Sequence, residues 1–154
     1  MTVLLSGKDM AEKIGARIPG AVLEANDQAV VIKSEYLLEV ADYLKNSPDM
    51  AFNQLTDITS VDYFDYFEII YRLTSIKKNA SMTFKVRCYD RDNPKIPSLI
   101  KTWRGADFME REVFDLMGIF FTGHPNMKRI FLWEGFQGHP LQKNFTEGKC
   151  SDKS

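Results

Sequence analysis

Four charged residues that could support chemistry lie close together in the sequence: Glu110, Arg111, Glu112 and Asp115. Glu112 and Asp115 are spaced i, i+3, so on a helix their carboxylates could converge on a cation or act in acid–base chemistry. Arg111 opposes this hypothesis, because an intrahelical pair with Asp115 would keep the carboxylates ionised at neutral pH. Charge patterning favours a solvated helix face, and a surface that docks a partner is the intermediate possibility.

Two histidines, His124 and His139, each precede a proline, which drives the preceding residue toward extended geometry. Nucleophilic catalysis would also need a Ser, Cys or Thr beside a base, and the chain has no GxSxG or comparable motif. Histidines that form hydrogen bonds in a turn or an interface are therefore favoured. A small standalone hydrolase that pairs either histidine with a helix carboxylate stays open as an alternative.

The usual motifs for cofactors and metals are missing from the sequence. Cys88 and Cys150 lie far apart and outside any CxxC, so the chain cannot supply four thiolates to an iron–sulfur cluster. No HExxH, GxGxxG or GxxxxGK[ST] occurs either, which argues against the common zinc, dinucleotide and P-loop sites. We therefore expect no catalytic, metal-binding or cofactor-binding residue in this chain.

The composition is that of one globular domain, with 154 residues of which 44% are hydrophobic and 27% charged. The 20 basic and 21 acidic residues nearly balance, so no broad positive field favours nucleic acid or an anionic bilayer. Asp115 interrupts the best apolar stretch, which stays far below the roughly 18 residues of a spanning helix. Because Val3-Leu4-Leu5 is too short for a signal peptide, we expect a cytoplasmic protein.

Hydrophobic periodicity in the first fifty residues predicts two amphipathic helices separated by a hairpin. The expected elements, in chain order, are a helix that follows a capping box at Ser6 and Asp9, a hairpin of residues 21–25 and 28–33, and a helix capped by Ser34. From Phe52 onward, alternation of apolar and polar residues predicts a three-stranded meander. Two of its strands, centred on Tyr71 and Phe84, pair across a turn at 77–79, and opposite charges on their polar faces can meet.

Residues 90–97 have the composition of a loop, and a third helix is expected to begin near Gly105-Ala106 and to keep its apolar side through Phe120. This order of elements predicts an α+β protein with two layers, a mixed or antiparallel sheet, helices packed on it and an irregular C-terminal tail. We expect residues 1–121 to form the domain and residues 122–154 to form an extended docking tail.

The predicted tail combines cations with a crowd of aromatic side chains, which are Phe120, Phe121, Phe131, Trp133, Phe136 and Phe145. Aromatic residues and arginine dominate the energetics of protein interfaces. The same residues can instead close the core of the domain itself, and the two hypotheses are equally supported.

Motifs in the last third of the chain resemble those of the C-type subunit of proton-pumping NADH-quinone oxidoreductase, respiratory complex I. The resemblance covers 110–112, 115–117, His124, Lys128, 130–131, 135–141 and Phe145. Weaker similarity reaches back to Phe52, and the first fifty residues add only a compatible fold. The chain departs from the family at Gln142 and Asn144, where the family usually has Arg and Asp.

This resemblance implies a peripheral subunit of the hydrophilic arm with no cofactor of its own and no independent activity. It implies contact with the D-type quinone-site subunit, the B-type iron–sulfur subunit and other hydrophilic-arm subunits, whereas FMN, iron–sulfur clusters and quinone reside in neighbouring chains. It further implies a location on the cytoplasmic side of the bacterial inner membrane, with membrane association only through the complex. An interaction adaptor unrelated to redox chemistry remains the alternative.

Within this hypothesis, charged residues of the last third hold the tail and dock it on its partners. The residues expected to set the tail's departure are Glu110, Arg111, Glu112 and Asp115, and those expected to dock it are His124, Lys128, Arg129, His139 and Lys143.

Overall fold

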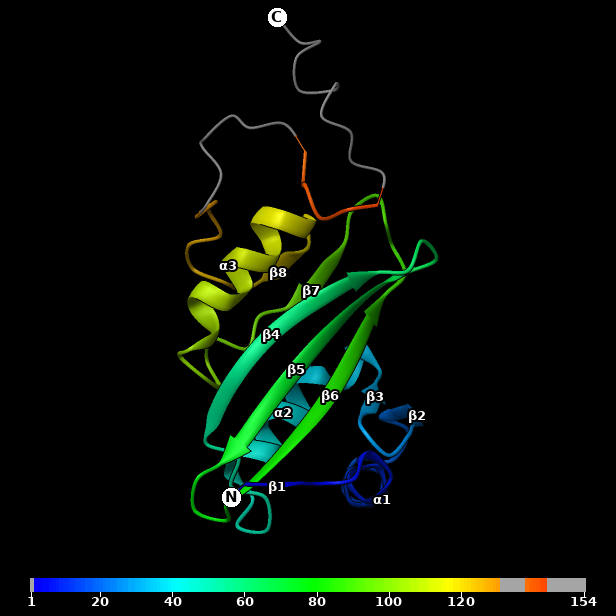
Figure 1. Cartoon of the computed structure of the whole chain (residues 1–154), viewed down its shortest axis with the longest axis vertical. Helices are drawn as coiled ribbons and strands as arrows, with labels where there is room; N and C mark the ends of the chain where they lie inside the picture. The colour runs from blue at the N-terminus through cyan, green and yellow to red at the C-terminus, as the bar shows by residue number, and fades with distance from the viewer. Residues whose placement is uncertain (1, 131–137, 144–154) are drawn as a thin grey trace, which may run out of the picture.

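The structure is a computed structural model that describes residues 2–130 and 138–143. Within these residues, a six-stranded sheet and three α-helices enclose one hydrophobic core (Figure 1). The α+β class and the mixed sheet covered by helices are therefore confirmed. The described residues also include a second, two-stranded sheet that the sequence did not predict.

The helical elements are α1 (Gly7–Arg17), the 3-10 turn η1 (Ser34–Tyr36), α2 (Leu37–Asn46) and α3 (Ala106–Met117). Their positions agree with the sequence, but the predicted caps do not. Ser6 precedes α1 without making a side-chain capping hydrogen bond, and Ser34 opens η1 instead of capping α2. None of the helices in the described part of the chain is long and apolar enough to cross a membrane.

The strands of the main sheet are β1 (Val3–Leu4), β2 (Val22–Ala25), β3 (Val30–Ile32), β4 (Gln54–Asp62), β5 (Phe67–Ser75) and β6 (Ala80–Cys88). They lie in the order β2-β3-β6-β5-β4, and β1 pairs with the first residues of β6. The hairpin β2–β3 and the meander β4–β5–β6 are antiparallel as predicted, whereas β3 and β1 run parallel to β6. Alternate residues of β5 and β6 enter the core, so period-2 alternation correctly identified their buried face.

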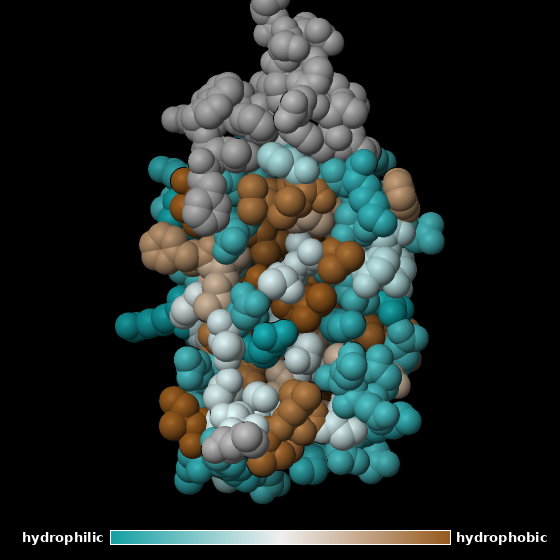
Figure 2. Space-filling view, viewed as in Figure 1, coloured by the Kyte–Doolittle hydropathy of each residue, from teal (hydrophilic) through white to brown (hydrophobic). Residues whose placement is uncertain are grey.

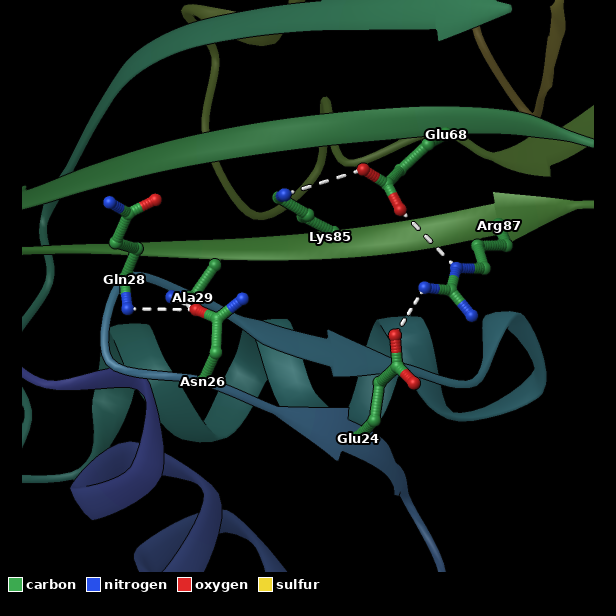
Figure 3. A network of polar contacts seen from close by, with 7 residues as sticks. All are labelled: Glu24, Asn26, Gln28, Ala29, Glu68, Lys85 and Arg87. Atoms are coloured by element: carbon green, nitrogen blue, oxygen red, sulfur yellow. Dashed lines mark hydrogen bonds and ion pairs between the residues drawn. The ribbon is translucent and has the colours of Figure 1, made fainter. Parts of the chain in front are cut away.

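The polar faces of β5 and β6 carry the cross-strand charge pair that the sequence predicted. Glu68 is nearly buried and accepts a hydrogen bond from Arg87 Nε (3.2 Å), while Lys85 Nζ lies 3.4 Å away (Figure 3). Arg87 also pairs with Glu24 of β2, so this network joins the N-terminal hairpin to the meander. Such a network fixes how β2 and β3 extend the sheet.

The prediction of a loop over residues 90–97 is confirmed for residues 90–94 and wrong for the last three residues, because β7 (Lys95–Pro97) pairs in parallel with β8 (Phe120–Thr122). Phe120 therefore belongs to a strand and not to the apolar side of the third helix. Both strands are only three residues long, too short for any alternation to stand out in the sequence. Their pairing anchors the chain on both sides of α3.

Candidate docking site at the third helix

Helix α3 places the predicted site residues on two different sides of itself. Val113 and Met117 pack into the core, as their spacing predicted, but Glu110 and Asp115 are fully buried as well. The helix stops at Gly118, whose φ of 79° lies in the left-handed region that ends many helices. A solvated face is therefore the wrong description for two of its carboxylates.

Glu110 is held by the segment that follows β7. Ser98 Oγ donates to its Oε1 (2.5 Å) and Leu99 N donates to its Oε2 (2.8 Å). Burial, with a smaller contribution from the charge of Asp107, raises the pKa of Glu110 to about 7 despite the lowering effect of the two hydrogen bonds. The expectation that every helix carboxylate stays ionised at neutral pH is thus wrong for Glu110.

Asp115 pairs with Arg129 and not with the predicted partner Arg111. Arg129 Nη1 lies 3.0 Å from Asp115 Oδ1, and the backbone N–H of Ile130 donates to Asp115 Oδ2 (3.1 Å). Arg129 also donates through Nη2 to the carbonyl of Gly138 (2.8 Å). The i, i+4 pair of Arg111 with Asp115 does not form, because Asp115 points inward and the segment after β8 supplies Arg129 as its cation.

Residues 138–143 cap the C-terminal end of α3. His139 Nδ1 donates to the Asp115 carbonyl (2.9 Å), and Leu141 N donates to the Leu116 carbonyl (2.9 Å). Gln142 Nε2 adds a bond to the Met117 carbonyl (2.6 Å). Three carbonyls that a helix end leaves without helical partners are therefore satisfied by a segment more than twenty residues later.

Gly118 makes room for this cap. A Cβ at Gly118 would lie 2.6 Å from His139 Cδ2 and 2.8 Å from Gln142 Nε2. Burial lowers the pKa of His139 below its ordinary value, so its ring is neutral at pH 7 and carries its proton on Nδ1, which faces a carbonyl. The departure from the family at Gln142 thus falls on a residue whose amide caps α3.

His124 is also engaged within the chain. Its side chain is fully buried, and its Nδ1 accepts the backbone N–H of Asn126 (2.9 Å), which places the ring proton on Nε2. Nε2 lies 3.0 Å from Asp107 Oδ1 and 3.3 Å from the Asp107 carbonyl. Neither nitrogen faces solvent, which argues against a hydrolytic role.

The remaining predicted residues lie at the surface. Arg111 lies over the ring of Phe108 (5.4 Å) and donates from Nε to the Lys128 carbonyl (3.2 Å). The side chains of Glu112 and Lys128 are exposed and form no polar contact with residues 2–130 or 138–143. Lys143 Nζ lies 4.9 Å over the exposed ring of Phe64. Whether these residues dock a partner stays a prediction.

Asp62, at the end of β4, is a central residue that the sequence reasoning did not assign to the site. Its buried carboxylate accepts two hydrogen bonds from Arg91 (2.5 and 3.0 Å), one from Phe64 N (2.9 Å) and one from Lys143 N (2.9 Å). The bond from Arg91 lowers the pKa of Asp62 to about 2. No local signal could reveal this role, since Lys143 is 81 residues away.

Several predicted tail residues lie outside the described residues, among them Phe131, Trp133, Phe136, Asn144, Phe145 and Cys150. In the described part of the chain, no group of three or more His, Cys, Asp or Glu residues could hold a metal ion.

Within the described residues, buried charges therefore anchor residues 138–143 on the end of α3, and both histidines form hydrogen bonds inside the chain. Residues 30–150 match the family described as the 30 kDa subunit of respiratory-chain NADH dehydrogenase. The chain belongs to this family of NADH-quinone oxidoreductase subunits.

Curated relatives agree with this assignment. The chain is 37% identical to the C-type subunit of NADH-quinone oxidoreductase from Roseiflexus sp. (strain RS-1), over 94% of this chain and 86% of the relative. It is 34% identical to the protein of the same name from Cupriavidus taiwanensis, over 88% of this chain and 73% of the relative.

Solved structures share the fold. A trypsin-resistant fragment of Nqo5 superposes with a TM-score of 0.64 at 30% identity, covering 77% of this chain and 97% of the fragment. A chain of an archaeal membrane-bound sulfane sulfur reductase superposes with a TM-score of 0.74 at 20% identity, covering 93% and 87% of the two chains. At that identity, the second likeness concerns the fold alone.

Proposed function

We propose that this chain is a peripheral, cofactor-free subunit that scaffolds the quinone module of a proton-pumping NADH-quinone oxidoreductase. It docks a D-type quinone-site subunit and a B-type iron–sulfur subunit on the cytoplasmic side of the bacterial inner membrane, and it meets the membrane only through the complex. Electrons pass through FMN, iron–sulfur clusters and quinone held by other chains.

One observation carries the proposal: the charged motif of α3 anchors residues 138–143 on the end of that helix. Asp115 and Arg129 are tied to the carbonyl of Gly138, and His139 is tied to the helix end. A buried network that fixes a C-terminal segment gives that segment a defined direction from which to reach a neighbour.

The motif residues then divide into two roles. Asp115, Arg129 and His139 position the tail through contacts inside the chain. Glu112 and Lys128 keep exposed charges that remain available to a partner. Charge-assisted hydrogen bonds from such residues give an interface its register and specificity.

The test is to replace Glu112 and Lys128 together with Ala and to measure how much of the chain enters the assembled enzyme. We expect reduced incorporation and an unchanged melting temperature of the isolated chain, because neither side chain forms a polar contact within the described residues. Lys101→Ala, which removes another exposed lysine, serves as the matched control. Normal assembly with lost turnover would instead assign a chemical role to these residues.

The adaptor hypothesis and the proposed function predict different partners. If the proposed function is correct, purification of the chain from its native membrane should yield quinone-site and iron–sulfur chains in stoichiometric amounts. Recovery with non-redox proteins alone would contradict the proposal.

A further inference from the structure

A basic pocket is lined by residues of α1, α2 and the turn between β5 and β6. Figure 1 shows α1 and this turn beside the N-terminal strand β1, at the end of the molecule opposite to residues 138–143. The volume of the pocket is about 520 Å³, and the chain after α2 also contributes to it. The lining residues are Lys13, Ala16, Arg17, Tyr43, Asp49, Met50 and Lys78. We call this cavity the basic pocket.

Three cations face one carboxylate in the basic pocket, in a chain whose overall charge is −1. No carboxylate of residues 2–130 or 138–143 lies within ion-pair distance of Lys13, Arg17 or Lys78. By contrast, Arg87, Arg91 and Arg129 are all paired. Unpaired cations that converge repel one another, and an external anion relieves that repulsion.

Two of these cations are held in place. Lys78 Nζ donates to the Asp49 carbonyl (2.7 Å), and the Arg17 guanidinium lies 5.9 Å from the centroid of the Tyr43 ring. The floor of the pocket includes the buried side chain of Met50. The pocket thus combines cationic donors with an apolar lining.

Exposed aliphatic side chains stand beside the turn that supplies Lys78. Ile76 is 66% exposed, and on the adjacent strand Val3 and Leu4 are 59% and 62% exposed. Val3 N donates to the Asn79 carbonyl (2.9 Å), which places β1 directly against this turn. In Figure 2, brown side chains stand among teal ones at this lower end of the molecule. These side chains add exposed aliphatic surface beside the cations of the basic pocket.

We propose that the basic pocket and its aliphatic neighbours form a second docking site, which takes a segment of a neighbouring subunit that alternates carboxylate and apolar side chains. The proposal rests on the proposed function as an assembly subunit and adds a contact at the opposite end of the molecule from the tail.

Charge complementarity favours a carboxylate-bearing segment over a phosphate group. Asp49 lies inside the pocket and repels any anion, and it repels a phosphate, with about two negative charges, more strongly than a carboxylate with one. Carboxylates spaced along a chain can reach Lys13 and Arg17 separately, while apolar side chains between them cover Ile76. An acidic segment therefore uses both features of this surface, whereas free phosphate uses only the cations.

Lysine acetylation tests the site in the enzyme as it exists. We expect Lys13 and Lys78 to react readily in the isolated chain and at least tenfold more slowly in the purified, assembled enzyme. Equal reaction in both would overturn the second docking site while leaving the proposed function intact. Absence of the chain from the purified enzyme would overturn the proposed function itself.

Two further experiments distinguish a protein segment from a lipid surface and from a phosphate ligand. Protection of the lysines that vanishes when phospholipid is stripped from the enzyme would identify a lipid surface. Equivalent protection of the isolated chain by inorganic phosphate would identify a phosphate ligand. Either result overturns the proposal, and protection that survives lipid removal and is not reproduced by phosphate supports it.

Charge variants complete the test. In competition with the wild-type chain, Arg17→Gln with Lys13→Gln should lower incorporation about tenfold, and Arg17→Lys should retain most of it. Lys8→Gln is the matched control, because Lys8 lies on the same helix, is exposed and does not line the basic pocket. An equal loss with Lys8→Gln would show a nonspecific effect of charge and would contradict the proposed site.

Discussion

Replacing Glu110 with Gln should remove a pH dependence of stability that this buried carboxyl imposes on the wild-type chain. The carboxyl is fully buried and its pKa rises from 4.5 to about 7 in the folded chain. Gln keeps the shape of the protonated acid and can still accept from Leu99 N and donate to Ser98 Oγ. The variant therefore imitates wild type in its protonated form at every pH.

The sign follows from which state holds the proton. Between pH 4.5 and 7 the folded chain keeps the Glu110 proton that the unfolded chain has released, so the free energy of unfolding falls as pH rises. The shift from 4.5 to about 7, at 1.36 kcal/mol per unit, gives a loss of about 3 kcal/mol. Wild type and Glu110→Gln should be equally stable below pH 4.5, and the variant should be more stable above pH 7.

Urea denaturation of both chains across this range measures the effect. His139 also contributes a pH dependence, because its pKa is lowered from 6.5 in the folded chain. Below pH 6.5 the free energy of unfolding therefore falls as pH falls, which is opposite in sign to the contribution of Glu110. Subtracting the two curves cancels such shared terms. Glu112→Gln, which changes an exposed carboxyl on the same helix that forms no polar contact within the described residues, is the matched control.

The reasoning would be refuted by a difference between wild type and Glu110→Gln that stays constant from pH 4.5 to 7. A Glu110→Gln chain that became less stable relative to wild type as pH rose would equally refute the role assigned to Glu110.

Three further predictions concern residues that contact the site. Tyr71→Phe should raise the free energy of unfolding by about 1 kcal/mol, because the buried Tyr71 hydroxyl has no hydrogen-bond partner among the described residues. A lower free energy of unfolding for the variant in denaturation experiments would contradict this prediction. Gly118→Ala should destabilise the chain by about 1 to 2 kcal/mol, because the φ of Gly118 is 79° and the new Cβ would collide with His139. Hydrogen exchange at the backbone N–H of Leu141, which bonds to the end of α3, should become faster. An unchanged exchange rate would refute this prediction. Asp62→Asn should lower the free energy of unfolding by about 2 kcal/mol at pH 7, because the pKa of the Asp62 carboxyl falls from 3.8 to about 2 on folding. This difference from wild type should vanish as pH falls through 2. A difference that persists in unfolding curves measured in acid would contradict the prediction.

Local patterns predicted the elements whose partners are close in sequence. The helical stripe of α2, the alternation in β5 and β6, and the hairpin around Asn26-Asp27 each appear within about a dozen residues, and all three were correct. The short strands β7 and β8 were missed because three residues show no period and their pairing spans all of α3.

The contacts of the charged residues on α3 differ from those that the sequence predicted. The sequence grouped Glu110, Glu112 and Asp115 on one helix and favoured a solvated face, whereas the structure buries Glu110 and Asp115. The expected pair of Asp115 with Arg111 is replaced by a pair with Arg129. Side-chain direction on a helix is decided by what packs against it, so spacing alone could not tell a surface pair from a buried one.

The amino-acid sequence by itself determined the α+β class, the buried faces of α2, β5 and β6, and the motif of α3 that marks the family, because these depend on the order of residue types along short stretches. Only the tertiary structure decided that Glu110 is a buried acid with a pKa near neutrality and that residues 138–143 cap α3. It also decided that Asp62 ties Arg91 to Lys143. Burial and long-range hydrogen bonds depend on segments that the chain brings together from far apart, and no local pattern carries that information.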